Sequence, residues 1–151
     1  SIAENFALPT LARDTTVGVI RSRRTAARLA AHGERLRLKM GRGSDAITTL
    51  SGGNQQKVII SRALADNPTV LLLNDPTRGI DQNAKNDIYT LIGDLLRRGL
   101  GVVLLSTEVD ELVHLTDRVL VFEGGTVSAD LVGDEITREA IVSAYFGAVV
   151  P

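Results

Sequence analysis

The chain has 151 residues, of which 44% are hydrophobic and 3% aromatic, and its net charge is −1. This length suffices for one domain with an ordinary core, and so few aromatic side chains argue against a stacking surface for single-stranded nucleic acid. Cysteine is absent and no apolar run is long enough to cross a bilayer, which excludes a disulfide framework and a membrane-spanning helix.

The first third of the chain predicts a small helical region. Residues 1–8 indicate a linker or short helix, residues 10–20 irregular structure, and residues 21–38 a helix with Gly33 at its middle. A loop rich in glycine and serine follows over residues 40–49. The first fifty residues carry nine basic and four acidic side chains; we interpret them as a solvated helix face rather than a nucleic-acid patch.

The next stretch has the sequence Leu50-Ser51-Gly52-Gly53-Asn54-Gln55-Gln56-Lys57, and a helix is predicted over residues 55–65. A serine and two glycines at the start of a helix leave backbone N–H groups sterically open beside a hydroxyl, at the positive end of the helix dipole. Such a turn suits a phosphate anion. The alternative is an ordinary helix that Ser51 caps.

A short apolar run over residues 70–73 predicts a strand that is buried on both faces. It ends in Asn74 and Asp75, and ligands of open α/β sheets bind beyond the carboxyl ends of such strands. The remaining pattern alternates helices and strands and includes a hairpin before the last helix, which favours a parallel sheet with an antiparallel hairpin at its edge. The expected elements are a helix over 83–98, a strand over 102–105, a helix over 108–115, hairpin strands over 119–122 and 126–129, and a helix over 137–146 that Thr137 caps.

Residues 50–57 resemble the signature sequence of ABC ATPases, residues 70–77 resemble their Walker B motif, and residues 78–81 resemble their D-loop. The finer resemblance is to the ATP-binding subunits of ribose- and xylose-type sugar importers, and to their second ATPase half in particular. It covers nearly the whole chain and is weakest over residues 10–49. It implies a partial P-loop ATPase domain of the α/β class, with a helical subdomain over residues 1–66 and half of the α/β core over residues 67–151.

The resemblance also implies roles for particular residues. The nucleotide-binding residues of the signature would be Ser51, Gly52, Gly53 and Gln55, which would meet the γ-phosphate of an ATP held by the partner ATPase half. The D-loop residues Gly79, Ile80 and Asp81 would lie at the seam between the halves. Asp81 is equally an N-cap for the following helix. Gln56 and Lys57 are interpreted as polar surface residues.

The Walker B segment departs from the family pattern of Asp followed by Glu. Asn74 occupies the position that holds the Mg²⁺ shell and is neutral. Asp75 occupies the position of the general base, and its side chain is shorter than that of glutamate by one methylene, about 1.5 Å. Thr107 stands where most ABC ATPases have a histidine, and its hydroxyl carries no charge. With Asp75 and Thr107 as its catalytic residues, this site is predicted to be slow or silent.

A complete P-loop needs a Gly-Lys pair, and none of the fourteen glycines precedes a lysine. We therefore expect the Walker A motif to precede Ser1, so that this chain is inactive alone. We also expect the strands over 70–73 and 102–105 to expose edges that permit self-association.

Three functions stay open. In the first, the chain is part of a sugar-importer ATPase that uses ATP and Mg²⁺ on the cytoplasmic face of the cell membrane. Its partners would be another ATPase half, the permease subunits and, indirectly, a periplasmic sugar-binding protein, with no nucleic acid. The second is a degenerate half that binds nucleotide or regulates assembly without turnover. The third is a soluble ABC ATPase of DNA repair or translation.

Overall fold

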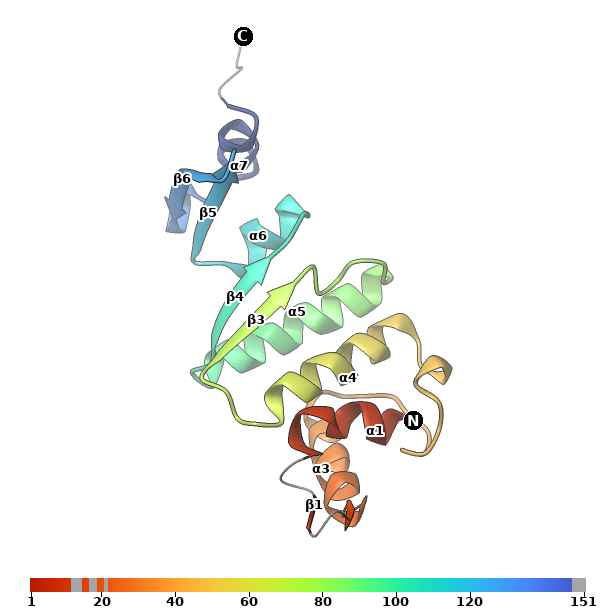
Figure 1. Cartoon of the computed structure of the whole chain (residues 1–151). Helices are drawn as coiled ribbons and strands as arrows, with labels where there is room; N and C mark the ends of the chain where they lie inside the picture. Colours follow the sequence, from red (N-terminus) through yellow and green to blue (C-terminus); the bar gives the residue numbers. More distant parts are fainter. Residues whose placement is uncertain (12–14, 17–18, 21, 148–151) are drawn as a thin grey trace. The chain divides into compact units, whose positions relative to one another are not determined.

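The computed structural model describes residues 1–11, 15–16, 19–20 and 22–147 (Figure 1). The chain forms two compact units. The first comprises residues 1–71 and 76–103, and the second comprises residues 72–75 together with the described part of residues 104–151. Among the helices that the structure describes, none combines the length and the apolar character that a membrane span requires.

The first unit is built around three helices, α1 (Ile2–Ala7), α3 (Ser22–Arg35) and α4 (Gly52–Leu64), as Figure 1 shows. A capping box starts α1, since the Ser1 hydroxyl accepts from the backbone N–H of Glu4 and the Glu4 carboxylate accepts from the Ser1 amino group. The apolar sides of the three helices share one buried cluster. Its members are Ile2, Phe6, Leu29, Leu50, Val58 and Ala65.

The expectation of irregular structure over residues 10–20 is wrong in part. A 3-10 helix covers Leu8–Thr10, and the short strands β1 (Thr15–Thr16) and β2 (Val19–Ile20) pair in antiparallel fashion. A second 3-10 helix, Ile47–Thr49, lies in the loop before α4. The rest of that prediction, over residues 12–14 and 17–18, lies outside the described residues.

Helix α5 (Gln82–Arg97) lies beside α4 and matches the amphipathic pattern of the sequence (Figure 1). Its buried side consists of Ile88, Leu91, Ile92 and Leu95. The helix stops where the sequence predicts, because Gly99 adopts a φ of 85°, which a residue with a Cβ rarely tolerates.

The strands β3 (Val70–Asn74) and β4 (Gly101–Leu105) form a parallel pair. At their beginnings the Gly101 N–H donates to the Thr69 carbonyl, and at their ends the Asp75 N–H donates to the Leu105 carbonyl. The prediction that β3 is buried on both faces is wrong. Leu71 and Leu73 are buried, whereas Leu72 is 76% exposed, because residues of a strand alternate between its faces and only one face is covered.

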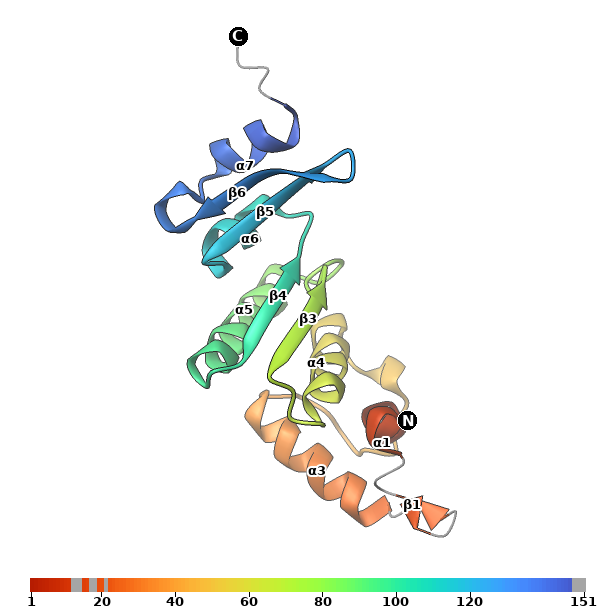
Figure 2. The same ribbon diagram turned by 60° about the vertical axis from the view of Figure 1, so that its left-hand side comes forward.

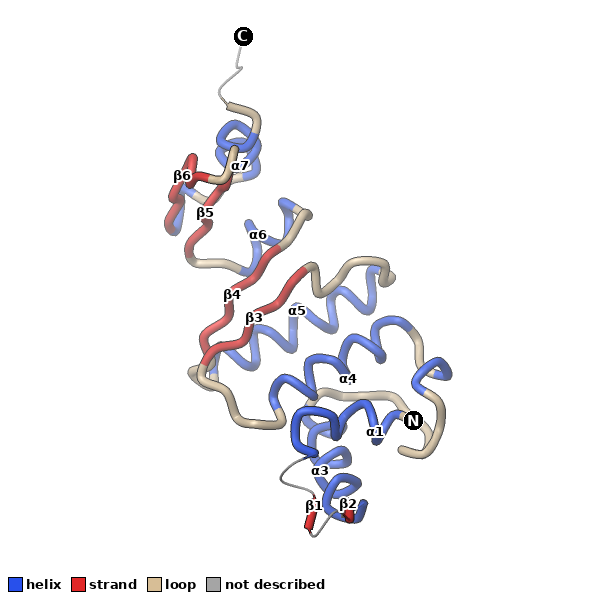
Figure 3. The backbone as a smooth tube through the Cα atoms, viewed as in Figure 1, coloured by secondary structure: helices blue, strands red, loops and turns tan. Residues whose placement is uncertain are grey.

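The second unit contains α6 (Val109–Leu115), the hairpin of β5 (Arg118–Glu123) and β6 (Thr126–Val132), a 3-10 turn (Gly133–Glu135) and α7 (Arg138–Tyr145). Figure 2 shows α7 alongside the hairpin, and in Figure 3 the strands stand in three separate pairs. The hairpin turn uses Gly124 and Gly125 at φ values of 55° and 83°, as its Gly-Gly sequence predicts.

The second unit has a small buried core, an ion pair across its hairpin and a capped last helix. Val119, Val121, Ile136 and Ile141 form its buried cluster. Across the hairpin, the Arg118 guanidinium donates to both carboxylate oxygens of Asp130 at 2.8 and 2.7 Å. The hydrogen bonds from Arg118 hold the pKa of the Asp130 carboxyl below its usual value. Thr137 caps α7 as predicted, because its hydroxyl accepts from the Ala140 N–H at 3.1 Å.

Candidate functional site

The predicted phosphate-binding turn lies at the exposed start of α4. This helix begins at Gly52, earlier than the sequence predicted, and its first intrahelical bond runs from the Gln55 N–H to the Ser51 carbonyl at 2.9 Å. In the described structure, the N–H groups of Gly52, Gly53 and Asn54 donate to no other backbone or side-chain atom. Three free donors at the positive end of a thirteen-residue helix form an anion-binding arrangement.

The Ser51 hydroxyl is held by Asn54, a residue that the sequence analysis did not single out. Ser51 has the backbone conformation of an N-cap, but its side chain accepts no backbone N–H. Its oxygen instead accepts from Asn54 Nδ2 at 2.9 Å, and Asn54 Oδ1 accepts from the Lys39 N–H at 3.0 Å. The serine proton therefore stays available for an outside acceptor. The three-residue spacing of Ser51 and Asn54 on one helix face was the signal for this contact.

An open cleft of about 620 Å³ lies against this turn. It runs between the turn and the loop that precedes α4. Its lining residues are Lys39, Met40, Gly41, Asp45, Thr49, Leu50, Ser51 and Asn54. The cleft leaves the Ser51 hydroxyl accessible to a ligand from outside the chain.

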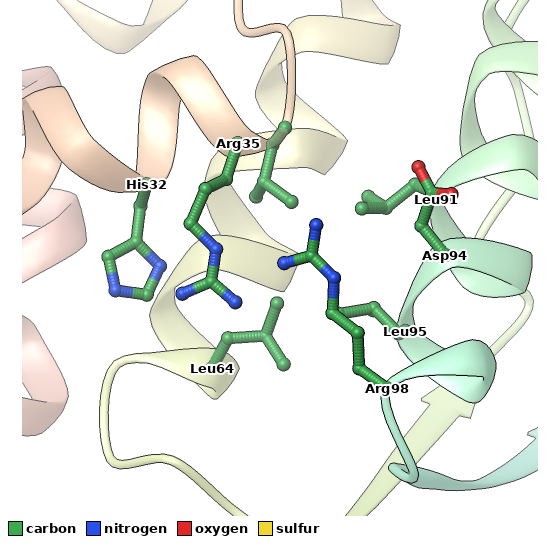
Figure 4. Close-up of a pocket in the computed structure, with 8 residues that line it drawn as sticks. His32, Arg35, Leu64, Leu91, Asp94, Leu95 and Arg98 are labelled. Carbon is green, nitrogen blue, oxygen red and sulfur yellow. The ribbon is translucent and has the colours of Figure 1, made fainter.

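A second cavity, shown in Figure 4, is too small for such a ligand. It lies where α3, α4 and α5 meet, and at about 10 Å³ it has room for about one water molecule. His32 and Arg35 line it on one side and Arg98 on the other (Figure 4). Burial, and then the charges of Arg35 and Arg28, lower the pKa of His32. His32 also packs against Phe6, with 5.3 Å between ring centroids, so its role is in packing.

The other polar residues of the turn are used within the protein. Gln55, predicted to contact nucleotide, donates from Nε2 to the Leu50 carbonyl at 2.9 Å. Lys57 was expected to be a polar surface residue, and this is wrong. It is 4% exposed, and its ammonium contacts Asp87 at 2.8 Å and the Arg37 carbonyl at 3.4 Å, because a buried ammonium needs partners.

The structure brings the predicted D-loop against the predicted signature. Gly79 adopts a φ of 76°, which turns the chain, and a Cβ placed on Gly52 would meet Ile80 Cγ2 at 3.3 Å. Asp81 is the N-cap of α5, since its Oδ1 accepts from the Ala84 N–H at 2.9 Å. The capping role predicted for Asp81 is confirmed.

The two predicted catalytic residues also meet. Asp75 follows β3 with a φ of 41°, in the left-handed region that non-glycine residues rarely occupy. Its Oδ1 accepts from the Thr107 N–H at 2.9 Å and from the Thr107 hydroxyl at 3.2 Å. Asn74, the predicted metal position, is exposed. The carboxylate of Asp75 is thus held beside the end of β4.

A buried carboxylate that sequence reasoning missed supports the same loop. Glu111 is 2% exposed, and its Oε2 accepts from the Ser106 hydroxyl at 2.6 Å. The Ser106 oxygen in turn accepts from the Glu108 N–H at 3.0 Å. These bonds fix the backbone on either side of Thr107.

The donors at the end of β3 do not by themselves make a metal site. Asn74 offers an amide oxygen and Asp75 one carboxylate, and in the part of the chain that the structure describes no three His, Asp or Glu side chains cluster as metal ligands. Mg²⁺ prefers six oxygens in near-octahedral geometry. Most of those oxygens would have to come from phosphates and water.

The chain is similar to two sugar-import proteins over most of its length. It is 42% identical to the ribose import ATP-binding protein RbsA 2 of Rhizobium meliloti over 147 residues, 97% of this chain and 29% of that protein. It is 41% identical to the xylose import ATP-binding protein XylG of Photobacterium profundum over 94% of this chain and 28% of that protein. The chain therefore spans less than a third of the length of these relatives.

Solved structures of ATP-binding cassettes share the fold. The dimeric cassette MJ0796, in a post-hydrolysis state bound to ADP and Pi, is 26% identical with a TM-score of 0.72, over 87% of this chain and 56% of that one. The cassette MJ1267 of an ABC transporter is 21% identical with a TM-score of 0.77, over 97% of this chain and 63% of that one. These similarities confirm the α/β fold of the P-loop ATPase type that the sequence predicted.

The last comparison is with models of protein families. The model of the ABC transporter family matches residues 2–78, half of the chain, and this match includes the signature turn, β3 and Asp75. Together with the relatives at about 40% identity, it shows that this chain belongs to the ABC transporter family.

Proposed function

We propose that this chain supplies the signature, Walker B and D-loop parts of the ATP-binding subunit of a sugar importer of the ribose or xylose type. The observation that carries the proposal is the start of α4, where three free backbone N–H groups lie beside the Ser51 hydroxyl, and Ser51 lines an open cleft. These donors suit the γ-phosphate of an ATP that another ATPase half holds by its P-loop. Residues 1–66 would then act as the helical subdomain, and residues 67–151 as part of the α/β core.

In this proposal ATP binding closes the two halves, because each phosphate donor of the signature gains an acceptor only in the closed state. The movement would pass to permease subunits in the membrane, with a periplasmic sugar-binding protein acting further upstream. The subunit would work on the cytoplasmic face of the membrane. The relatives are named as ribose and xylose import ATP-binding proteins, and these names support this choice of partners.

Hydrolysis at the site that uses Asp75 is proposed to be slow. A general base must lie within hydrogen-bond reach of the attacking water, and a misplacement of about 1 Å can cost about 10²-fold in rate. The Asp75 carboxylate is shorter than that of a glutamate and already accepts two hydrogen bonds from Thr107. Mg²⁺ would arrive with the phosphates of the nucleotide and supply charge neutralisation, with Asn74 and Asp75 as the donors from this chain.

The test uses a protein that joins this chain to an ATPase half with an intact P-loop. ATPγS-induced closure is measured by the distance between spin labels on the two halves, for the wild type and for Ser51→Arg. We expect Ser51→Arg to abolish closure, because the larger side chain fills the phosphate position. The control is Ala63→Arg, at an exposed position of the same helix. Closure that persists in Ser51→Arg would overturn the proposal.

A degenerate half that binds nucleotide or regulates assembly without turnover is the second candidate. Asn74 and the engaged carboxylate of Asp75 favour it. Inactivating each ATPase half separately discriminates the two. With the other half inactive, a slow site retains some turnover that Asp75→Ala abolishes, whereas a silent site shows none. A soluble ABC ATPase of DNA repair or translation is the third candidate, and DNA-stimulated ATP hydrolysis would support it.

Self-association of this chain also stays a prediction. The outward side chains of β3 and β4 support it, since Val70, Leu72, Val103 and Leu105 are all more than half exposed. Light scattering at high concentration tests it, and a monodisperse monomer would contradict it.

A further inference from the structure

The signature turn and the D-loop are joined by a tight helix contact within the first unit. Gly53 is buried, and a Cβ built on it would lie 2.5 Å from Ala84 Cβ on the first turn of α5. No Cβ atom tolerates such an approach, so position 53 has to be a glycine as long as α4 and α5 keep this spacing. The neighbouring Gly52 differs, because it is exposed and its nearest neighbour is the terminal Ile80 Cγ2 at 3.3 Å.

One helical turn further along, an ion pair closes the same interface. Lys57 of α4 is buried, and its ammonium contacts the Asp87 carboxylate of α5 at 2.8 Å. The Asp87 side chain is 61% exposed, so only the lysine end of the pair is desolvated. A desolvated ammonium is costly unless it is paired, which favours the arrangement that keeps Lys57 near Asp87.

The D-loop is attached to the same turn of α5. Asp81 accepts from the Ala84 N–H at 2.9 Å, so the residue that receives Gly53 is also the one that fixes the D-loop side chain. Ile80, the preceding D-loop residue, touches the position of Gly52. The signature turn and the D-loop are therefore both attached to the same pair of helices, α4 and α5.

We propose that Gly53, Ala84, Lys57 and Asp87 form an intramolecular clamp that sets the signature turn and the D-loop in one fixed arrangement. The absence of a side chain at Gly53 serves this packing, whereas the absence of one at Gly52 serves the approach of a ligand. Lys57 and Asp87 are positioning residues, because the Lys57 ammonium contacts Asp87 and the Arg37 carbonyl and neither partner belongs to the signature turn or the D-loop. What the two loops contact rests on the proposed function, but the clamp itself does not.

The test of the packing contact is a compensating pair of substitutions, followed by amide hydrogen exchange in this 151-residue chain. We expect Gly53→Ala to raise the exchange rates of the α4 and α5 amides around the contact by about tenfold or more. The double variant Gly53→Ala/Ala84→Gly restores the space that the new methyl needs, so it should return most of the protection. Gly52→Ala is the control and should leave the first turn of α5 protected.

Two results would overturn the packing role. One is an effect of Gly53→Ala that stays within residues 52–56. The other is a double variant that is no better protected than Gly53→Ala alone, with Ala84→Gly itself close to wild type. Should Gly53→Ala fail to fold, rescue of folding by Ala84→Gly gives the same answer.

The ion pair provides an independent test, because removing its exposed carboxylate should have a larger effect than removing its buried ammonium. Asp87→Asn leaves a buried ammonium with only neutral oxygens as partners, whereas Lys57→Met leaves a carboxylate that is mostly in water. We therefore expect Asp87→Asn to accelerate exchange of the hydrogen-bonded amides beside the two loops, those of Gln55, Ala84 and Lys85, more than Lys57→Met does. Equal effects, or effects confined to one of the two loops, would contradict the clamp.

The clamp and the proposed function fail separately. In the two-half protein, Gly53→Ala should reduce ATPγS-induced closure and the double variant should recover it. If closure never occurs in the wild type while exchange shows the coupling of the two loops, the proposed function is wrong and the clamp stands. If closure occurs but Ala84→Gly rescues neither closure nor exchange in Gly53→Ala, the clamp is wrong.

Discussion

Thr107 donates twice to one oxygen of Asp75, through its backbone N–H at 2.9 Å and through its hydroxyl at 3.2 Å. The acceptor follows β3 and the donor follows β4, so this contact ties together the ends of two parallel strands. The other carboxylate oxygen of Asp75, Oδ2, has no hydrogen-bond partner among the described residues.

Thr107→Val tests the side-chain bond alone, because valine keeps the backbone donor and the shape of threonine. One hydrogen bond is worth about 0.5–1.5 kcal/mol net, and solvent exposure of Thr107 places the expected loss of unfolding free energy at the low end. Urea titration measures it. Thr48→Val, at an exposed position where the hydroxyl has no partner among the described residues, is the control for the substitution itself.

Restoring acidic residues at the end of β3 should raise the rate of ATP hydrolysis in the two-half protein. Asn74→Asp adds a charge at the proposed metal position, and Asp75→Glu extends the proposed base by about 1.5 Å. We expect the double variant to hydrolyse ATP about 10²-fold faster in single-turnover experiments at this site. An unchanged rate, with nucleotide-induced closure intact, would show that the geometry of Asp75 is not what limits hydrolysis.

Asn54 should control the orientation of the Ser51 hydroxyl. Asn54→Ala removes the donor to Ser51 and the acceptor for the Lys39 N–H, and we expect ATPγS-induced closure to need about tenfold more nucleotide, which equals about 1.4 kcal/mol. Asn54→Asp keeps the acceptor but places a negative charge near the phosphate, so it should be worse than alanine. Faster exchange of the Lys39 amide in Asn54→Ala alone would confirm the second bond.

His32 should make stability depend on pH near neutrality. Burial and the neighbouring arginines lower its pKa in the folded protein, so the unfolded chain binds the proton more readily. The stability associated with neutral His32 is therefore present above the ordinary histidine pKa of about 6.5 and is lost as pH falls toward the folded-state pKa. Urea midpoints between about pH 8 and pH 5 should fall less steeply for His32→Gln, and NMR titration reports the pKa directly.

Elements that depend on local signals could be predicted from the sequence. Gly99 ends α5, Thr137 caps α7, and Gly124 with Gly125 turns the hairpin, each through backbone constraints that neighbouring residues impose. Ser51 and its glycines likewise predicted a helix start at the turn that we propose to bind phosphate.

Contacts between distant residues could not be predicted in this way. Lys57 and Asp87 are thirty positions apart, and a lysine on a polar helix start gives no sign that its ammonium is buried. Asp75 and Thr107 were each identified by their place in a motif, but their hydrogen bonds depend on the pairing of β3 with β4. The burial of β3 depends on what covers each face of the sheet, which the strand's own residues do not specify.

The 2.5 Å approach at Gly53 has a consequence for how related chains diverge. A methyl group gained on one helix has to be matched by one lost on the other, so positions 53 and 84 should substitute as a pair over evolutionary time. A homologue with alanine at the first position is expected to carry glycine at the second, or to separate the two helices.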